Sequence, residues 1–196
     1  MISSLHQSLE RLSSLSAWAS GFALVAVALL VTVDVLCRKL LGATLAGSDE
    51  IAGYTLAGAA SWSFSYCLLK RAHIRIDLLY NWTSLRVRCW LDLVALLALL
   101  LFMSLFTYRA IGVLVESIQT GATSNTALVT PLWIPQTVWV TGLIYFTFTV
   151  AVVTLNSIVL ISNRDYAAIR QLAGIPTIEE EVQTETEGVL DTVHAR

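Results

Sequence analysis

The ionisable side chains beside long apolar segments are the candidates for chemistry in this chain, and the first of them is Asp34. It follows an uncharged run over residues 13–33. An isolated carboxylate at mid-membrane depth is a default candidate for ion or proton coupling. Arg38 stands four residues later, on the same face of a helix, where the two side chains can pair. The spacing therefore favours a structural ion pair over a coupling site.

Other catalytic and cofactor chemistries lack their usual residues. The three histidines all lie outside the long apolar runs, at His6, His73 and His194. A haem-binding bundle needs histidines at bundle depth. The three cysteines lack CxxC spacing and resemble small buried hydrophobes: Cys37, Cys67 and Cys89. Walker, GxSxG and HExxH motifs are absent from the sequence. We expect no enzyme, no cofactor and no metal site.

The elements that position these residues are apolar helices. The chain of 196 residues is 56% hydrophobic and 13% charged, and its mean hydropathy is +0.72. A transmembrane helix needs about 20 apolar residues. We predict an all-α polytopic membrane protein with four transmembrane helices, at about 17–37, 51–69, 93–113 and 134–161. The third reaches full length only if Asp92 and Arg109 extend to the two interfaces.

Basic residues predict the orientation. One set of alternate connections carries eight: Arg11, Lys70, Arg71, Arg75, Arg86, Arg88, Arg164 and Arg170. The other carries three: Arg38, Lys39 and Arg109. The positive-inside rule then places both termini in the cytoplasm. We expect a cytoplasmic segment at 1–16, a membrane domain at 17–162 and an acidic, disordered cytoplasmic tail at 163–196.

The connection after the second span predicts an additional helix. Its apolar residues recur every three or four positions, at Leu78, Trp82, Leu85 and Cys89. This pattern predicts an amphipathic helix in the membrane plane over about 74–90. Nearby basic side chains either bind lipid headgroups or only set the topology: Lys70, Arg71, Arg75, Arg86 and Arg88.

The second span and the later external connection also have distinctive compositions. The second span is rich in small residues, among them Gly53, Ala57 and Gly58, which allow close approach of another helix in this chain or in a partner. The connection between the third and fourth spans, 117–135, is uncharged and rich in Thr and Ser. It either packs on protein or faces solvent. Its prolines, Pro131 and Pro135, should break the helix on the way into the fourth span.

Three short stretches together resemble a known family. They are Asp34-Val-Leu-Cys-Arg38, Ser48-Asp49-Glu50-Ile-Ala, and Lys70-Arg71-Ala-His73-Ile-Arg75-Ile-Asp77. In this order and with this span number, the chain resembles the small (DctQ-like) membrane subunit of tripartite ATP-independent periplasmic (TRAP) transporters, over about residues 12–162. Ser48 departs from the pattern, because many members carry an aromatic residue there.

The resemblance implies a subunit that works only with partners. A large membrane subunit would carry the substrate and sodium sites, and a periplasmic binding protein would deliver a small organic-acid-type solute. The small subunit would be a scaffold in the bacterial inner membrane. We expect Arg38 and Glu50 to pair with each other or to anchor the large subunit. We expect His73 and Asp77 to close the turn before the in-plane helix.

Two other functions stay open at this point. A self-contained four-helix transporter or channel would use Asp34 as its coupling carboxylate. A membrane assembly protein would use its acidic tail to bind a soluble partner.

Overall fold

The computed structural model describes residues 2–70 and 85–163, which form four α-helices. Their bounds are α1 Ile2–Leu41, α2 Ser48–Leu69, α4 Leu85–Thr120 and α5 Trp133–Ser162. Three of them, α1, α4 and α5, are long and apolar enough to cross a membrane. The chain is therefore an all-helical, multi-pass membrane protein. The shorter α2 does not meet that criterion, so a fourth span remains a prediction.

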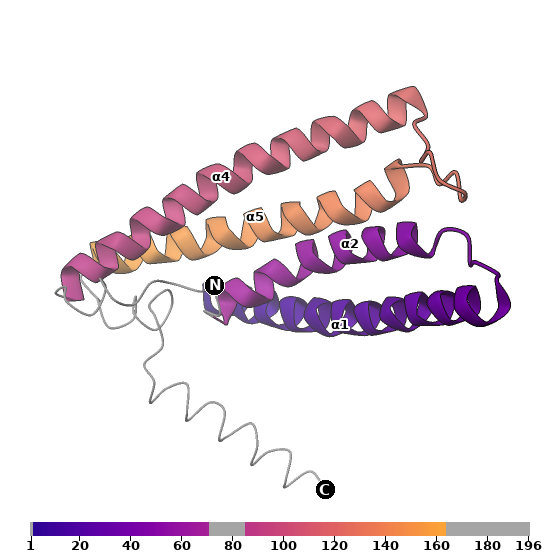
Figure 1. The fold of residues 1–196 in the computed structure, drawn as a ribbon. Coiled ribbons are helices and arrows are strands. Elements are labelled where there is room, and N and C mark those ends of the chain that lie inside the picture. The colour runs from indigo at the N-terminus through magenta and orange to yellow at the C-terminus, as the bar shows by residue number, and fades with distance from the viewer. Residues whose placement is uncertain (1, 71–84, 164–196) are drawn as a thin grey trace, which may run out of the picture.

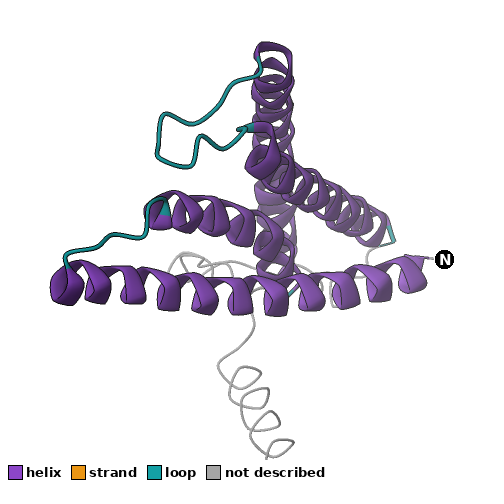
Figure 2. Ribbon diagram, turned by 90° about the vertical axis from the view of Figure 1, so that its right-hand side faces the viewer, coloured by secondary structure: helices purple, strands orange, loops and turns teal. Residues whose placement is uncertain are grey.

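The helices lie side by side in the order α1, α2, α5, α4, with α1 and α4 at the two sides of the layer (Figure 1). The main contacts join α1 to α2, α2 to α5, and α5 to α4. Seen after a 90° turn, α1 and α4 run in clearly different directions (Figure 2). The four helices thus form an open, splayed layer, in which α5 is covered on two sides.

Two short connections join the helices at one end of this layer, which we call the connected end. Residues 42–47 link α1 to α2, and residues 121–132 link α4 to α5. Figure 1 shows both connections on its right-hand side. Left-handed backbone begins both connections, at Gly42 with φ 65° and at Gly121 with φ 61°. Glycine adopts this conformation without steric penalty and so ends a helix.

The helices extend beyond the predicted spans. Residues 85–90, the last part of the predicted in-plane helix, are the first turns of α4, whereas the rest of that prediction lies outside the described residues. At its other end α4 continues to Thr120, eleven residues past Arg109. Pro135 lies within the first turn of α5, where a missing N–H is tolerated because it has no partner inside the helix.

The contact between α2 and α5 depends on small side chains. The buried residues of α2 include Gly58, Ala59, Ser61 and Ser65. Gly142 of α5 faces them: a Cβ there would lie 2.3 Å from Ser61 Oγ and 2.8 Å from Trp62 Cδ1. The indole of Trp62 donates a 3.0 Å hydrogen bond to the Val138 carbonyl oxygen. Glycine at 142 therefore sets how closely the two helices approach.

Hydroxyl groups along α5 are satisfied inside their own helix. Each donates to the carbonyl four residues earlier at 2.7–2.9 Å: Thr147 to Leu143, Thr149 to Tyr145, Thr154 to Val150, and Ser157 to Val153. Thr107 Oγ1 of α4 lies 2.8 Å from Thr147 Oγ1 and links the two helices. Polar groups at membrane depth need such internal partners, because lipid tails offer none.

Replacing Gly142 with Leu should destabilise the isolated chain. The new side chain would collide with Ser61 and Trp62, and overpacking of this kind costs about 1–3 kcal/mol. The thermal unfolding midpoint in detergent should fall. Gly53→Ala is the matched control, because a Cβ at Gly53 meets nothing within 4 Å. Equal midpoints for the two variants would contradict this account of the seam.

Candidate functional site at the connected end

Asp34 is the centre of a polar cluster at the connected end. Its side chain is buried, with 1% of the residue exposed. Arg38 Nη2 lies 2.7 Å from Asp34 Oδ2, and the Ser48 hydroxyl donates to the same oxygen at 2.9 Å. The backbone N–H of Leu45 donates to Asp34 Oδ1 at 2.5 Å. One carboxylate therefore links α1, the 42–47 connection and the start of α2.

The local sequence explains why the chain returns to Asp34. Gly42 ends α1 and reverses the backbone, so that Leu45 and Ser48 come back to the last turns of the helix. Gly47, with φ 90°, then caps α2, and its carbonyl accepts the Ile51 N–H at 3.0 Å. Non-glycine residues rarely adopt this φ. Both glycines are thus needed to place two donors on one carboxylate.

Glu50 forms a second cluster, which holds the longer connection. The Thr126 hydroxyl donates to Glu50 Oε2, and the Tyr54 hydroxyl donates to Oε1 at 2.6 Å. These hydrogen bonds, that from Thr126 first, lower the pKa of Glu50 from 4.5 to about 2. Glu50 precedes the apolar run that begins at Ile51, and it lies in the first turn of α2, where the helix dipole also favours an anion.

The 121–132 connection, which we call the arm, has a defined shape. Thr123 and Pro131 form an antiparallel bridge, and the Ser124 N–H donates to the Thr130 carbonyl at 2.9 Å. At its tip, Val129 has φ 49°, an unfavourable value for a β-branched residue, and its N–H donates to the Thr126 carbonyl at 3.1 Å. The arm is mostly exposed, and it packs on the rest of the chain through Thr126 and Leu128.

Leu128 and Gly47 bring the two connections together. A Cβ at position 47 would lie 2.3 Å from Leu128 Cγ and Cδ1, so that a larger residue there would push the arm away. Together with the bond from Thr126 to Glu50, this contact joins the α4–α5 side of the layer to the α1–α2 side. The connected end is therefore a single clasp, made by the Asp34 cluster, the Glu50 cluster and the arm.

Several residues that the sequence analysis singled out have other partners or a different exposure from those expected. Arg38 and Glu50 do not pair, because Arg38 binds Asp34 on its own helix and Glu50 accepts from two hydroxyls. The two residues therefore do not pair with each other in this structure, and their anchoring of the large subunit remains a prediction. Asp49 is exposed. Gly53 and Ala57 are exposed as well, so the contact with α5 uses Gly58 and its buried neighbours instead.

The structure describes only part of the predicted in-plane region. His73 and Asp77 lie outside the described residues, as do Arg71 and Arg75. Lys70 is exposed and caps the end of α2. Arg86 and Arg88 belong to the first turn of α4, and Arg88 is half-buried with an interaction partner. Their binding of lipid headgroups remains a prediction.

Sequence reasoning missed the arm's part in the clasp. Thr126 is one of several similar residues in an uncharged, polar stretch, and no sequence signal marks it as the partner of Glu50. Gly142 was missed because a single glycine in an apolar helix is common. Gly47 could have been noticed, because a glycine immediately before Ser-Asp-Glu is a plausible helix start.

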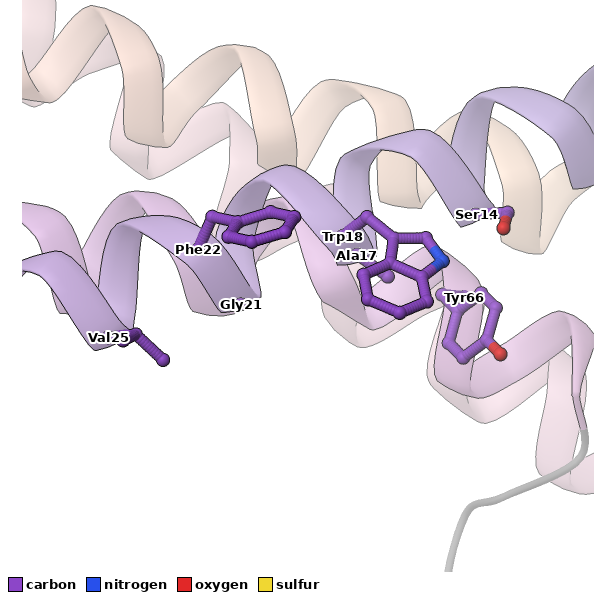
Figure 3. Close-up of a pocket in the computed structure, with 7 residues that line it drawn as sticks. All are labelled: Ser14, Ala17, Trp18, Gly21, Phe22, Val25 and Tyr66. Carbon is purple, nitrogen blue, oxygen red and sulfur yellow. The ribbon is translucent and has the colours of Figure 1, made fainter. Parts of the chain in front are cut away.

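A shallow apolar hollow lies along the outer side of α1, away from the clasp (Figure 3). Trp18 and Phe22 line it with ring centroids 6.1 Å apart, and Tyr66 of α2 closes one side. Both α1 aromatic residues are more than two-thirds exposed in this chain. Exposed aromatic surface of this size is expected where lipid or another membrane protein covers a helix.

Comparison with known families decides what kind of membrane protein this is. A family model described as the DctQ component of tripartite ATP-independent periplasmic transporters matches residues 27–160. The chain belongs to this family. The match includes the whole clasp, all of α2 and α4, and nearly all of α5. The resemblance inferred from the sequence is thereby confirmed. The comparisons with curated proteins and with solved structures give no match.

As a DctQ component, the chain is a membrane subunit of a transport system with three parts. The clasp is then a feature of a transporter subunit, and its Asp34 carboxylate is already engaged by three donors. Among the described residues, no group of three or more His, Cys, Asp or Glu side chains could hold a metal ion.

Replacing Asp34 with Ala should destabilise this DctQ component more than replacing Arg38 with Ala. Loss of the carboxylate leaves the Leu45 N–H and the Ser48 hydroxyl without their acceptor, and the buried Ser48 hydroxyl alone then costs about 1–3 kcal/mol. The Arg38 side chain is 55% exposed, so its pairing contributes about 1 kcal/mol or less. Thermal unfolding in detergent measures both. The opposite order of midpoints would contradict the role given to Asp34.

Acid should release the arm. The largest cause of the lowered pKa of Glu50 is the hydrogen bond from Thr126, which exists only when the arm is docked, whereas the bond from Tyr54 lies within α2. Docking is therefore stabilised above pH 4.5 and weakens as the pH falls towards 2. A spin label at position 129 should become more mobile over this range. The Glu50→Gln variant should show the mobile spectrum already at pH 7. A label whose mobility is the same in both proteins at every pH would contradict the docking role of Glu50.

Proposed function

We propose that this chain is the scaffold subunit of a sodium-coupled TRAP transporter and has no substrate site of its own. It would hold the static part of the large membrane subunit in the bacterial inner membrane, with both termini in the cytoplasm. The solutes would be small organic acids delivered by a periplasmic binding protein. Family membership supports the three-part system, and the geometry of the chain supports the scaffold role.

The observation that carries this proposal is that the hydrogen bonds of Asp34 and Glu50, and the ion pair of Asp34, stay within this chain. They lie in the clasp at the connected end, and each carboxylate there is occupied by donors of the same chain. A transport site needs polar groups that are free to exchange partners with a solute or an ion near mid-membrane. The clasp instead serves to fix the relative positions of four helices.

The open arrangement of the four helices also supports the scaffold role. A self-contained transporter encloses a pathway between its helices, whereas here α1 and α4 stand at opposite sides and leave long apolar faces uncovered (Figures 1 and 2). Lipid covers such faces in part, but a subunit of a larger complex also offers them to its partner. An open layer is a suitable shape for a scaffold.

A self-contained transporter that uses Asp34 is the competing function. The same geometry argues against it, because Asp34 lies close to the end of α1 and is held by Arg38, Leu45 and Ser48. Protonation of this carboxylate would break the clasp rather than open a path. An assembly protein that acts through its acidic tail predicts loss of function on deletion of residues 176–196, whereas the scaffold tolerates that deletion.

Solute uptake should need all three components. We expect sodium-driven uptake of an organic acid into proteoliposomes that contain this chain, its large subunit and the binding protein. Omitting this chain should abolish uptake, because the large subunit loses its scaffold. Uptake by this chain alone, lost in Asp34→Asn, would establish the competing function instead.

A further inference from the structure

Arg109 is an exposed charge at membrane depth on α4. The link between Thr107 and Thr147 aligns this part of α4 with the middle of α5, since Thr147 stands 14 residues after Trp133 and 15 before Ser162. Arg109 is two residues further along α4, about 3 Å at 1.5 Å per residue. Both α4 and α5 are long and apolar enough to span the membrane. The charge therefore lies level with the middle part of α5, within a helix that is long and apolar enough to span the membrane.

The helix direction hinders Arg109 from reaching water. The nearer end of α4, at Thr120, is eleven residues away, or about 16 Å. Side chains of an α-helix lean towards its N-terminus, so that Arg109 leans towards Leu85, away from that nearer end. Extension to the interface, which the sequence predicted for Arg109, thus works against the geometry of the helix.

Arg109 also faces away from the rest of this chain. The buried side chains of α4 that face α5 include Met103, Thr107 and Ala110. At 100° per residue, Arg109, Gly112 and Glu116 fall on the opposite face, and all three are exposed. Within residues 2–70 and 85–163 Arg109 has no hydrogen-bond or ion-pair partner. We call this surface the outer face of α4.

The shape of the outer face suits another helix. Gly112 lies between the two charged residues, and a Cβ built on it would meet nothing within 4 Å. A shallow hollow follows the same face and is lined by Arg109, Gly112, Glu116 and Gln119 among others. Charged residues in membrane spans almost always face protein or a water-filled cavity, where they find partners. Because glycine has no side chain, Gly112 allows a second helix to come close to the charge of Arg109.

We propose that the outer face of α4 is a docking surface for the large TRAP membrane subunit, and that Arg109 binds an acceptor on a membrane helix of that subunit. The acceptor is a carboxylate or a set of free backbone carbonyl oxygens, because an arginine has five donors and no acceptor. This proposal rests on the proposed scaffold function. It adds the face that docks and the residue that selects the partner.

Replacing Arg109 with Leu tests the docking surface, because the change should lower the yield of the complex without lowering the stability of the isolated chain. In the isolated chain the change removes a lipid-exposed charge, so the thermal midpoint should stay the same or rise. In co-purification with the co-expressed large subunit, the recovered complex should fall by about tenfold, the size of effect expected from one interhelical polar contact. Arg109→Lys should restore part of the yield. Lys39→Leu, which removes an exposed charge at the end of α1, is the matched control and should keep the full yield.

A photoreactive residue at position 105, on the same outer face, identifies the occupant directly. Cross-linking to the large subunit, lost in the Arg109→Leu background, is the expected result. Adducts only with lipid, or with a second copy of this chain, would overturn the proposal, as would a full complex yield for Arg109→Leu. If the wild-type chain fails to co-purify with the large subunit, the proposed scaffold function itself is wrong. A wild-type complex without cross-links at 105 overturns only the docking face.

Discussion

A carboxylate that is withdrawn from water must be surrounded by donors, and this requirement at Asp34 organises the connected end of the molecule. Its three donors come from α1, from the 42–47 connection and from the start of α2, so that none of these segments can move independently. Removing one member of such a buried cluster is costly, because the remaining buried polar groups are left without a hydrogen-bond partner. The Glu50 cluster and the arm extend the same constraint to α4 and α5.

Away from the clasp the layer is held by weaker and more distributed contacts. The hydroxyls of α5 are satisfied by their own helix, and the α2–α5 contact relies on the close approach that Gly142 permits. Such contacts fix the spacing of neighbouring helices without closing the layer into a bundle. The uncovered faces of α1 and α4 then fit a DctQ component that works within a complex, and the outer face of α4 around Arg109 is the surface that we propose for one partner.

Much of the architecture could be predicted from the sequence, because apolar run length and charge placement are strong signals in membrane proteins. The helices α1, α4 and α5 are predictable for that reason, whereas the family is predictable from the three short stretches that resemble it. The helix ends were less predictable, since helices continue into the interface: α4 runs past both Asp92 and Arg109, which were expected at the two interfaces. A transmembrane α2 and the in-plane helix remain predictions.

The clasp was only partly predictable. The spacing of Asp34 and Arg38 indicated a pair, because residues four apart share a helix face. The partners of Glu50 could not be inferred, since contacts between Glu50 and an arm 76 residues later depend on how the helices cross. Arg38 does not pair with Glu50 for a different reason, because Asp34 is already in place as a partner four residues earlier on the same helix.

The central claim is that this chain is a static scaffold fixed at its connected end. It is tested most directly by spin labels at positions 40 and 118, at the ends of α1 and α4, in the assembled transporter reconstituted in lipid. The distance between the two labels should be the same with and without sodium and solute, because the clasp holds all four helix ends together. A distance that changes with sodium or solute would mean that this subunit moves during transport, and would contradict the account.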